Sequence, residues 1–129
     1  MQKVLPIVSW LIALLLAVAV GLNWFLLPDS AAAEFGITLD GIKAYSQVRA
    51  DIGGVFIGAS GVLAFGLVKR EPKFLFATAA IIFCAAMGRL LSLMMDGVHQ
   101  DSYGPMVVEL IMTTVIVLTA RSFADNANS

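Results

Sequence analysis

The chain has 129 residues, of which 60% are hydrophobic and only 13% are charged, and its formal net charge is −1 at pH 7. This composition lies outside the range of soluble domains and indicates one integral membrane domain. The few basic residues form no patch, which excludes nucleic acid as a partner. The single cysteine, Cys84, has no second cysteine to pair with, so an intrachain disulfide and a thiolate metal site are also excluded.

The first predicted element is a membrane-spanning helix over residues 4–27. It contains 24 residues with one strongly polar side chain, Asn23, and would extend roughly 36 Å, enough to cross a hydrocarbon core of about 30 Å. A signal peptide is the competing interpretation, because residues 31–33 resemble a cleavage site. The apolar run is longer than a usual secretory core, which favours an uncleaved anchor.

A short interfacial helix is expected next, over residues 30–35. Pro28 and Asp29 end the first span, and Gly36 suits the end of the short helix. Asp40 then has the residue type and position of an N-cap for the second span.

Three further spans are predicted over residues 41–68, 74–95 and 105–121. The last extends for only 16 residues from Pro105 to Ala120, roughly 24 Å of helix, so it requires flanking residues or a locally thinned bilayer. The sequence therefore predicts an all-α fold, an integral membrane four-helix bundle that forms a single domain over residues 1–129.

Four spans place both termini on the same side of the membrane. Lys3, the loop of residues 69–73 and Arg121 all fall on that side, whereas the loops on the other side are acidic or mixed. The positive-inside rule then predicts cytoplasmic termini.

Each span also contributes a polar side chain at a similar depth. Asn23, Asp51, Arg89 and Glu109 are expected roughly 6 to 10 Å inside the outer boundary, with Arg49 slightly further out. Two arginines and two carboxylates balance, which allows buried charges to remain ionised. Because Arg89 and Glu109 lie at matching depth on the arms of an antiparallel hairpin, we predict that they pair.

Glycines are the predicted positions of close helix packing. The set comprises Gly53, Gly54, Gly58, Gly61 and Gly88. Closely spaced small residues let neighbouring helices approach in a membrane. A phosphate-binding loop is excluded for this run, since it requires a preceding strand and a following Lys-Ser/Thr pair.

The polar layer has two interpretations that the sequence leaves open, a structural clasp that sets helix register or a binding site. No catalytic residue is predicted, because the serines and threonines of the spans lack a histidine partner. His99, alone in a polar loop, is interpreted as an exposed residue rather than a metal ligand. The sequence therefore predicts no metal and no cofactor.

The short motifs of the spans resemble a known family. Arg49-Ala50-Asp51-x-Gly53-Gly54 opens the second span, Gly88-Arg89 lies late in the third and Glu109 early in the fourth. This pattern is similar to the bacterial domain-of-unknown-function 4345 family (DUF4345), which resembles DoxX-like four-helix membrane proteins. The resemblance implies a multi-pass protein of the bacterial inner membrane, and it implies no activity.

Three functional hypotheses follow. The first is a non-enzymatic membrane protein that binds a small amphiphile, a lipid or quinone-like molecule, in an outward-facing pocket floored by Asp51, Arg89 and Glu109. The second is a structural or accessory subunit whose Gly54-x-x-x-Gly58 face docks on another copy or a larger membrane complex. The third is a proton-coupled carrier or membrane enzyme that uses Glu109 or Asp51.

Overall fold

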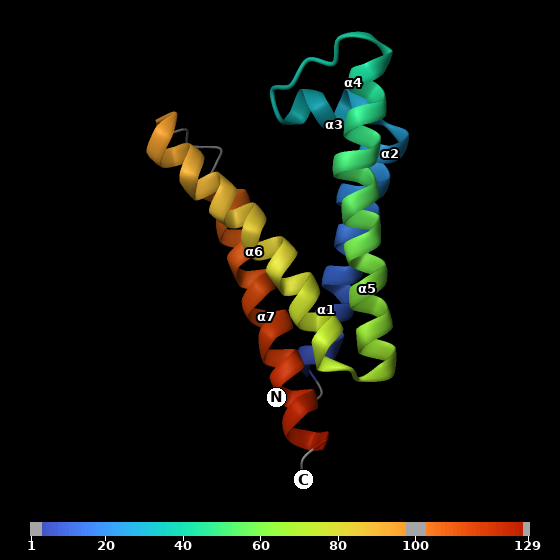
Figure 1. Ribbon diagram of the computed structural model, residues 1–129, viewed down its shortest axis with the longest axis vertical. Coiled ribbons are helices and arrows are strands. Elements are labelled where there is room, and N and C mark those ends of the chain that lie inside the picture. The colour runs from blue at the N-terminus through green and yellow to red at the C-terminus, as the bar shows by residue number, and fades with distance from the viewer. Residues whose placement is uncertain (1–3, 98–102, 128–129) are drawn as a thin grey trace. The chain divides into compact units, whose positions relative to one another are not determined.

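The computed structural model describes residues 4–97 and 103–127, and every regular element in these ranges is a helix (Figure 1). Four helical stretches are long and apolar enough to cross a membrane, namely Val4–Leu26, Gly41–Lys69, Pro72–Met95 and Tyr103–Asn126. The predicted all-α fold with four membrane-spanning helices is therefore confirmed.

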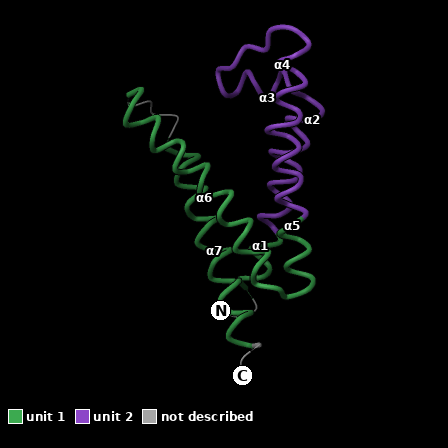
Figure 2. Tube along the Cα trace, in the orientation of Figure 1, with its two compact units in different colours: residues 1–10, 62–129 green, residues 11–61 purple. Residues whose placement is uncertain are grey.

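The chain divides into two compact units (Figure 2). One comprises residues 11–61, and the other comprises residues 1–10 and 62–129. The first and second spans each contribute to both units.

The unit of residues 11–61 contains the end of the first span, a short helix and the start of the second span. Its elements are α1 (Val4–Leu15), η1 (Leu16–Leu22), α2 (Asn23–Leu26), α3 (Pro28–Glu34), α4 (Gly41–Val48), η2 (Arg49–Gly54) and α5 (Val55–Lys69), of which α1 and α5 extend beyond it. The short helix predicted over residues 30–35 is present as α3 over Pro28–Glu34, and its place at the membrane interface stays a prediction. Gly36 follows α3 with a φ of +66°, a conformation that glycine adopts without strain. Ala31 and Ala32 of α3 are buried with Trp24 in one apolar cluster, so the connection between the spans is packed against α2.

Two segments of this unit, η1 and η2, are π-helical and contact each other. Glycine permits a close approach at this level. A Cβ added to Gly53 would lie 3.1 Å from the backbone nitrogen of Phe25 and 3.2 Å from the carbonyl oxygen of Gly21, and a Cβ on Gly21 would lie 2.6 Å from Cγ1 of Ile57. The two spans therefore meet with almost no side chain between their backbones.

The other unit is dominated by α6 (Pro72–Met95) and α7 (Tyr103–Ala127), which pack side by side (Figure 1). Buried residues recur on each helix at intervals of three and four, the spacing of a helical stripe. They are Leu75, Ala79, Ile82 and Ala86 on α6, and Glu109, Met112, Ile116 and Ala120 on α7. Glu109 thus belongs to the buried side of α7, as does the polar residue Thr119.

Several predicted helix bounds differ from the observed ones. The third helix was predicted from residue 74, but α6 begins at Pro72. The fourth helix was predicted over residues 105–121, but α7 begins at Tyr103 and continues to Ala127. Hydropathy marks where a helix leaves lipid, not where it ends, and hydrogen bonds from Ser122 and Asn126 to backbone carbonyls one turn earlier accompany the extension. Asp40 stands at the N-cap of α4 in an extended conformation, but its side chain makes no capping hydrogen bond.

Candidate functional site

The five residues of the predicted polar layer are divided between the two units. Asn23, Arg49 and Asp51 belong to residues 11–61, whereas Arg89 and Glu109 belong to the other unit. Each group has its own set of partners, and a single layer that joins all five stays a prediction.

Arg89 and Glu109 contact each other, as predicted. Nε of Arg89 donates to both carboxylate oxygens of Glu109 at 3.1 Å. Arg89 lies three residues beyond Ala86, at the end of the buried stripe of α6, so both charges occupy positions that face the packed side of their helices. The ion pair therefore lies at the end of the apolar contact between α6 and α7.

Arg49 has a different partner, the carbonyl oxygen of Phe25 near the end of α2. Pro28, which begins α3, has no N–H, and the chain leaves helical geometry at Leu27. Both features deprive the last carbonyls of α2 of their usual donors. Nε of Arg49 donates to Phe25 O at 3.0 Å, and its positive charge stands where the helix dipole is negative.

Two of the four carboxylates of this unit, Asp29 and Asp51, accept hydrogen bonds from neutral donors. Tyr45 donates its hydroxyl to Asp29 at 2.6 Å, which ties α4 to α3. Asp51 accepts a hydrogen bond from the side-chain amide of Gln47, one helical turn earlier. Within this unit, no lysine or arginine nitrogen lies within 4.0 Å of either carboxylate.

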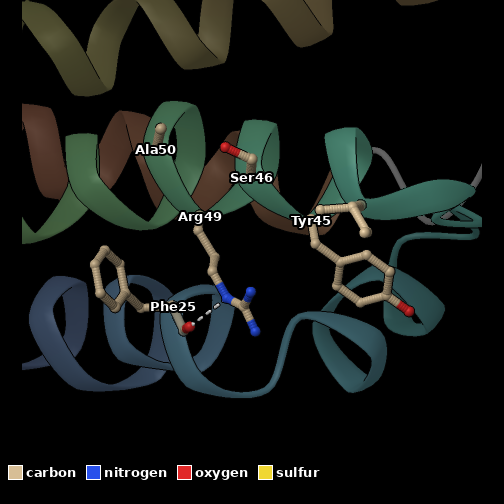
Figure 3. A pocket seen from close by; sticks show the side chains of 6 residues that line it. Phe25, Tyr45, Ser46, Arg49 and Ala50 are labelled. Atoms are coloured by element: carbon tan, nitrogen blue, oxygen red, sulfur yellow. Dashed lines mark hydrogen bonds between the residues drawn. The ribbon is translucent and has the colours of Figure 1, made fainter.

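Beside Arg49 lies an open pocket of about 500 Å³ (Figure 3). Its lining residues are Phe25, Ile42, Tyr45, Ser46, Arg49 and Ala50. The figure shows the guanidinium between the side chains of Phe25 and Tyr45, and its central carbon is 5.9 Å from the centre of the Tyr45 ring. The pocket thus combines an apolar lining with one permanent positive charge.

Asn23 lies in a second open groove, on the surface of the first span. The groove is otherwise lined by Val18, Ala19, Leu22, Leu26 and Leu27. Among the described residues of this unit, no hydrogen bond joins the side chain of Asn23 to Arg49 or Asp51.

The predicted packing glycines have unequal surroundings. Gly53 makes the close contact with Phe25 described above, whereas a Cβ on Gly54 would meet only the carbonyl of Arg49 in its own helix, at 3.5 Å. A Cβ on Gly58, Gly61 or Gly88 would meet no described atom of its own unit within 4 Å, so packing of these three against another helix stays a prediction.

The glycine face of α6 also differs from its buried stripe. Gly88 shares one face of α6 with Ala80 and Cys84, at intervals of four residues, and all three are exposed. Small residues permit close packing, but the larger stripe of Leu75 and Ile82 provides the apolar contact in this hairpin.

Several contributing residues were not identified from the sequence. The spacing of Gln47 and Asp51, four residues apart on one helix, was an available signal. Nothing local marks Tyr45 and Asp29 as partners, because they lie 16 residues apart on different helices. Gly21, likewise, has no glycine at helical spacing to distinguish it.

His99 lies outside the described residues. Among residues 4–97 and 103–127, no three His, Cys, Asp or Glu side chains are grouped so that they could hold a metal ion.

Comparison with known proteins gives one family. Residues 4–120 match the family described as Domain of unknown function (DUF4345). No curated protein and no solved structure matches the chain. The match covers most of the 129 residues, with the first three membrane-spanning helices and most of the fourth, and the chain therefore belongs to the DUF4345 family.

Proposed function

We propose that this multi-pass membrane protein is not an enzyme and that it binds a small amphiphile, a lipid or quinone-like molecule, in the pocket beside Arg49. The observation that carries the proposal is an open, mostly apolar pocket that contains a fixed guanidinium and lies where the first span ends and the second begins. Sites for small molecules are typically apolar hollows with few, well-placed polar groups.

The exposed apolar surface of the pocket supports this proposal. Ile42 is 90% exposed and Phe25 is 43% exposed, so an acyl or isoprenoid chain can cover both. Each buried Å² of apolar surface contributes roughly 25 cal/mol.

The proposal moves the centre of the site from Asp51, Arg89 and Glu109 to Arg49. Nε of Arg89 bonds both oxygens of Glu109, which supports a structural clasp in that hairpin. Because both oxygens of Glu109 are held by one arginine, the geometry argues against Glu109 as a proton shuttle.

Substitution of Ile42 by serine tests amphiphile binding. Since this side chain is almost fully exposed, Ile42→Ser should leave folding unchanged and weaken retention of membrane amphiphiles roughly tenfold, from the loss of about 1.5 kcal/mol of apolar burial. Native mass spectrometry of protein released from membranes measures retention. Ile37→Ser is the matched control, because Ile37 is also exposed in this unit and does not line the pocket. Equal retention by both variants, or no bound amphiphile in the unsubstituted protein, would reject the proposal.

A second function is supported by the glycines of α5. Gly58 and Gly61 are exposed and have no neighbour in their own unit, which supports docking of this face on another copy or on a larger membrane complex. Gly58→Leu should then reduce chemical crosslinking between differently tagged copies and co-purification from the native membrane. Unchanged crosslinking and an unchanged set of partners would remove this function.

We further propose that the protein resides in the bacterial inner membrane with both termini in the cytoplasm. The basic residues Lys69, Arg70, Lys73 and Arg121 support this orientation. A C-terminal reporter that is active only in the periplasm should stay inactive, and its activity would contradict the orientation.

A further inference from the structure

Only one of the three guanidinium nitrogens of Arg49 makes a hydrogen bond within its unit. Its Nε donates to Phe25 O, and its two terminal nitrogens make no hydrogen bond to a described residue of the same unit. The bond to Phe25 holds the planar group in place (Figure 3). A guanidinium that one hydrogen bond holds in place, and whose terminal N–H groups remain available, is pre-organised to bind a second acceptor.

An anion is the acceptor that this fork fits. An arginine keeps its positive charge at all ordinary pH values, and its parallel N–H groups match the oxygens of a phosphate or carboxylate. The carboxylates of Asp29 and Asp51 are bound by Tyr45 and Gln47, and neither lies within 4.0 Å of the guanidinium in a salt bridge. Within its unit the charge of Arg49 meets the carbonyl of Phe25 and the face of the Tyr45 ring, and it has no carboxylate partner in a salt bridge.

The lining of the pocket favours a lipid over a free anion. Phe25, Ile42 and Ala50 are apolar, and Ile42 is almost fully exposed. A small hydrated anion gains nothing from this surface, whereas the upper part of an acyl chain would cover it. Arg49 lies beside the last turn of the first span and eight residues after the start of the second, and a long arginine side chain at this place can extend to the level of the lipid headgroups.

We propose that the amphiphile bound beside Arg49 is an anionic phospholipid, with a phosphate oxygen on the terminal nitrogens of Arg49 and acyl carbons against Ile42 and Phe25. This inference rests on the proposed function and specifies its ligand. Lipid recognition by basic groups at the membrane surface follows the same electrostatic rule.

Two probes with identical acyl chains test the ligand class, namely phosphatidylglycerol, which carries an anionic phosphate, and diacylglycerol, which is neutral. Each is titrated into the purified full-length protein in detergent, and binding is measured by native mass spectrometry. We expect phosphatidylglycerol to bind at least about tenfold more tightly, the ratio for one charge-assisted hydrogen bond. Equal binding would overturn the anionic ligand and leave amphiphile binding intact, whereas binding of neither probe would overturn the proposed function.

Substitution of Arg49 tests whether this residue causes the preference for phosphatidylglycerol. Arg49→Gln should abolish the preference for phosphatidylglycerol and retain the binding of diacylglycerol. Lys43→Gln is the control, because it removes an equal charge from exposed α4 at a position outside the pocket. A preference that survives Arg49→Gln, or that Lys43→Gln abolishes equally, would overturn the inference. If Arg49→Gln does not fold, the two-probe comparison on the unsubstituted protein still decides it.

Discussion

The pair of Arg89 and Glu109 should show a strongly non-additive response to substitution. The Glu109 side chain is 12% exposed and that of Arg89 is 31% exposed, and Nε of Arg89 lies 3.1 Å from both carboxylate oxygens. Removal of one partner leaves the other without its counter-charge at a depth where an unpaired charge costs about 2.5 to 3.5 kcal/mol. Arg89→Leu and Glu109→Leu should each therefore destabilise the protein.

The two single substitutions should differ in magnitude. Arg89→Leu strands the less exposed carboxylate and should cost about 3 kcal/mol, whereas Glu109→Leu leaves a long, partly exposed arginine that reaches toward water and should cost about 2 kcal/mol. The double substitution replaces the pair by apolar side chains and should cost about 2 kcal/mol or less, so the coupling free energy is about 3 kcal/mol.

Equilibrium unfolding in mixed detergent micelles, followed by circular dichroism, measures these free energies. Arg121→Leu is the control, because Arg121 is an exposed arginine of α7 and has no ion pair among the described residues. It should change stability by less than about 0.5 kcal/mol. If the losses of the two single variants simply add in the double variant, the clasp is not a stabilising pair and the reasoning is wrong.

Three further substitutions test helix contacts within the units. Gly53→Ala should destabilise the protein by about 1 to 3 kcal/mol, because the new Cβ would lie 3.1 Å from the backbone of Phe25. Gly54→Ala should be neutral or stabilising, because only its own helix lies nearby. Equal thermal stability of the two variants would contradict this difference. Ser9→Ala removes the 2.8 Å hydrogen bond between the buried hydroxyls of Ser9 and Thr119. It should cost only about 0.6 kcal/mol, since Thr119 keeps its bond to a backbone carbonyl, and a loss above about 2 kcal/mol in the same unfolding assay would show that the hydroxyl pair has a larger role.

Much of the fold follows from local sequence properties. The four spans were predictable because the length of an apolar run and its bounding polar residues are read without knowledge of any neighbour. The Arg89 and Glu109 contact was also predictable, because a short loop forces two helices to be antiparallel neighbours and counting residues from the loop gives the depth of each side chain.

The contacts that could not be predicted from the sequence depend on the direction in which each side chain points around its helix. Counting along a regular α-helix would place Asp51 on the face of Gly54, Gly58 and Gly61, but Arg49–Gly54 is π-helical. A π-helical turn changes the angle between successive side chains, so a face deduced by counting in fours is displaced beyond it. No residue type in the sequence marks such a turn.

The sequence by itself determined the helical class, the four spans and the pairing within one hairpin, because these depend on hydropathy, length and depth. Only the tertiary structure decided that Arg49 binds the carbonyl of Phe25, that Tyr45 holds Asp29, and that Gly53 and Gly21 lie where two backbones meet. These contacts join residues of different helices, and each depends on the rotation of both helices about their axes. The carbonyl of Phe25 loses its usual donor, the N–H of Asp29, where the chain leaves helical geometry at Leu27, and Arg49 can replace that donor only when the two spans lie together.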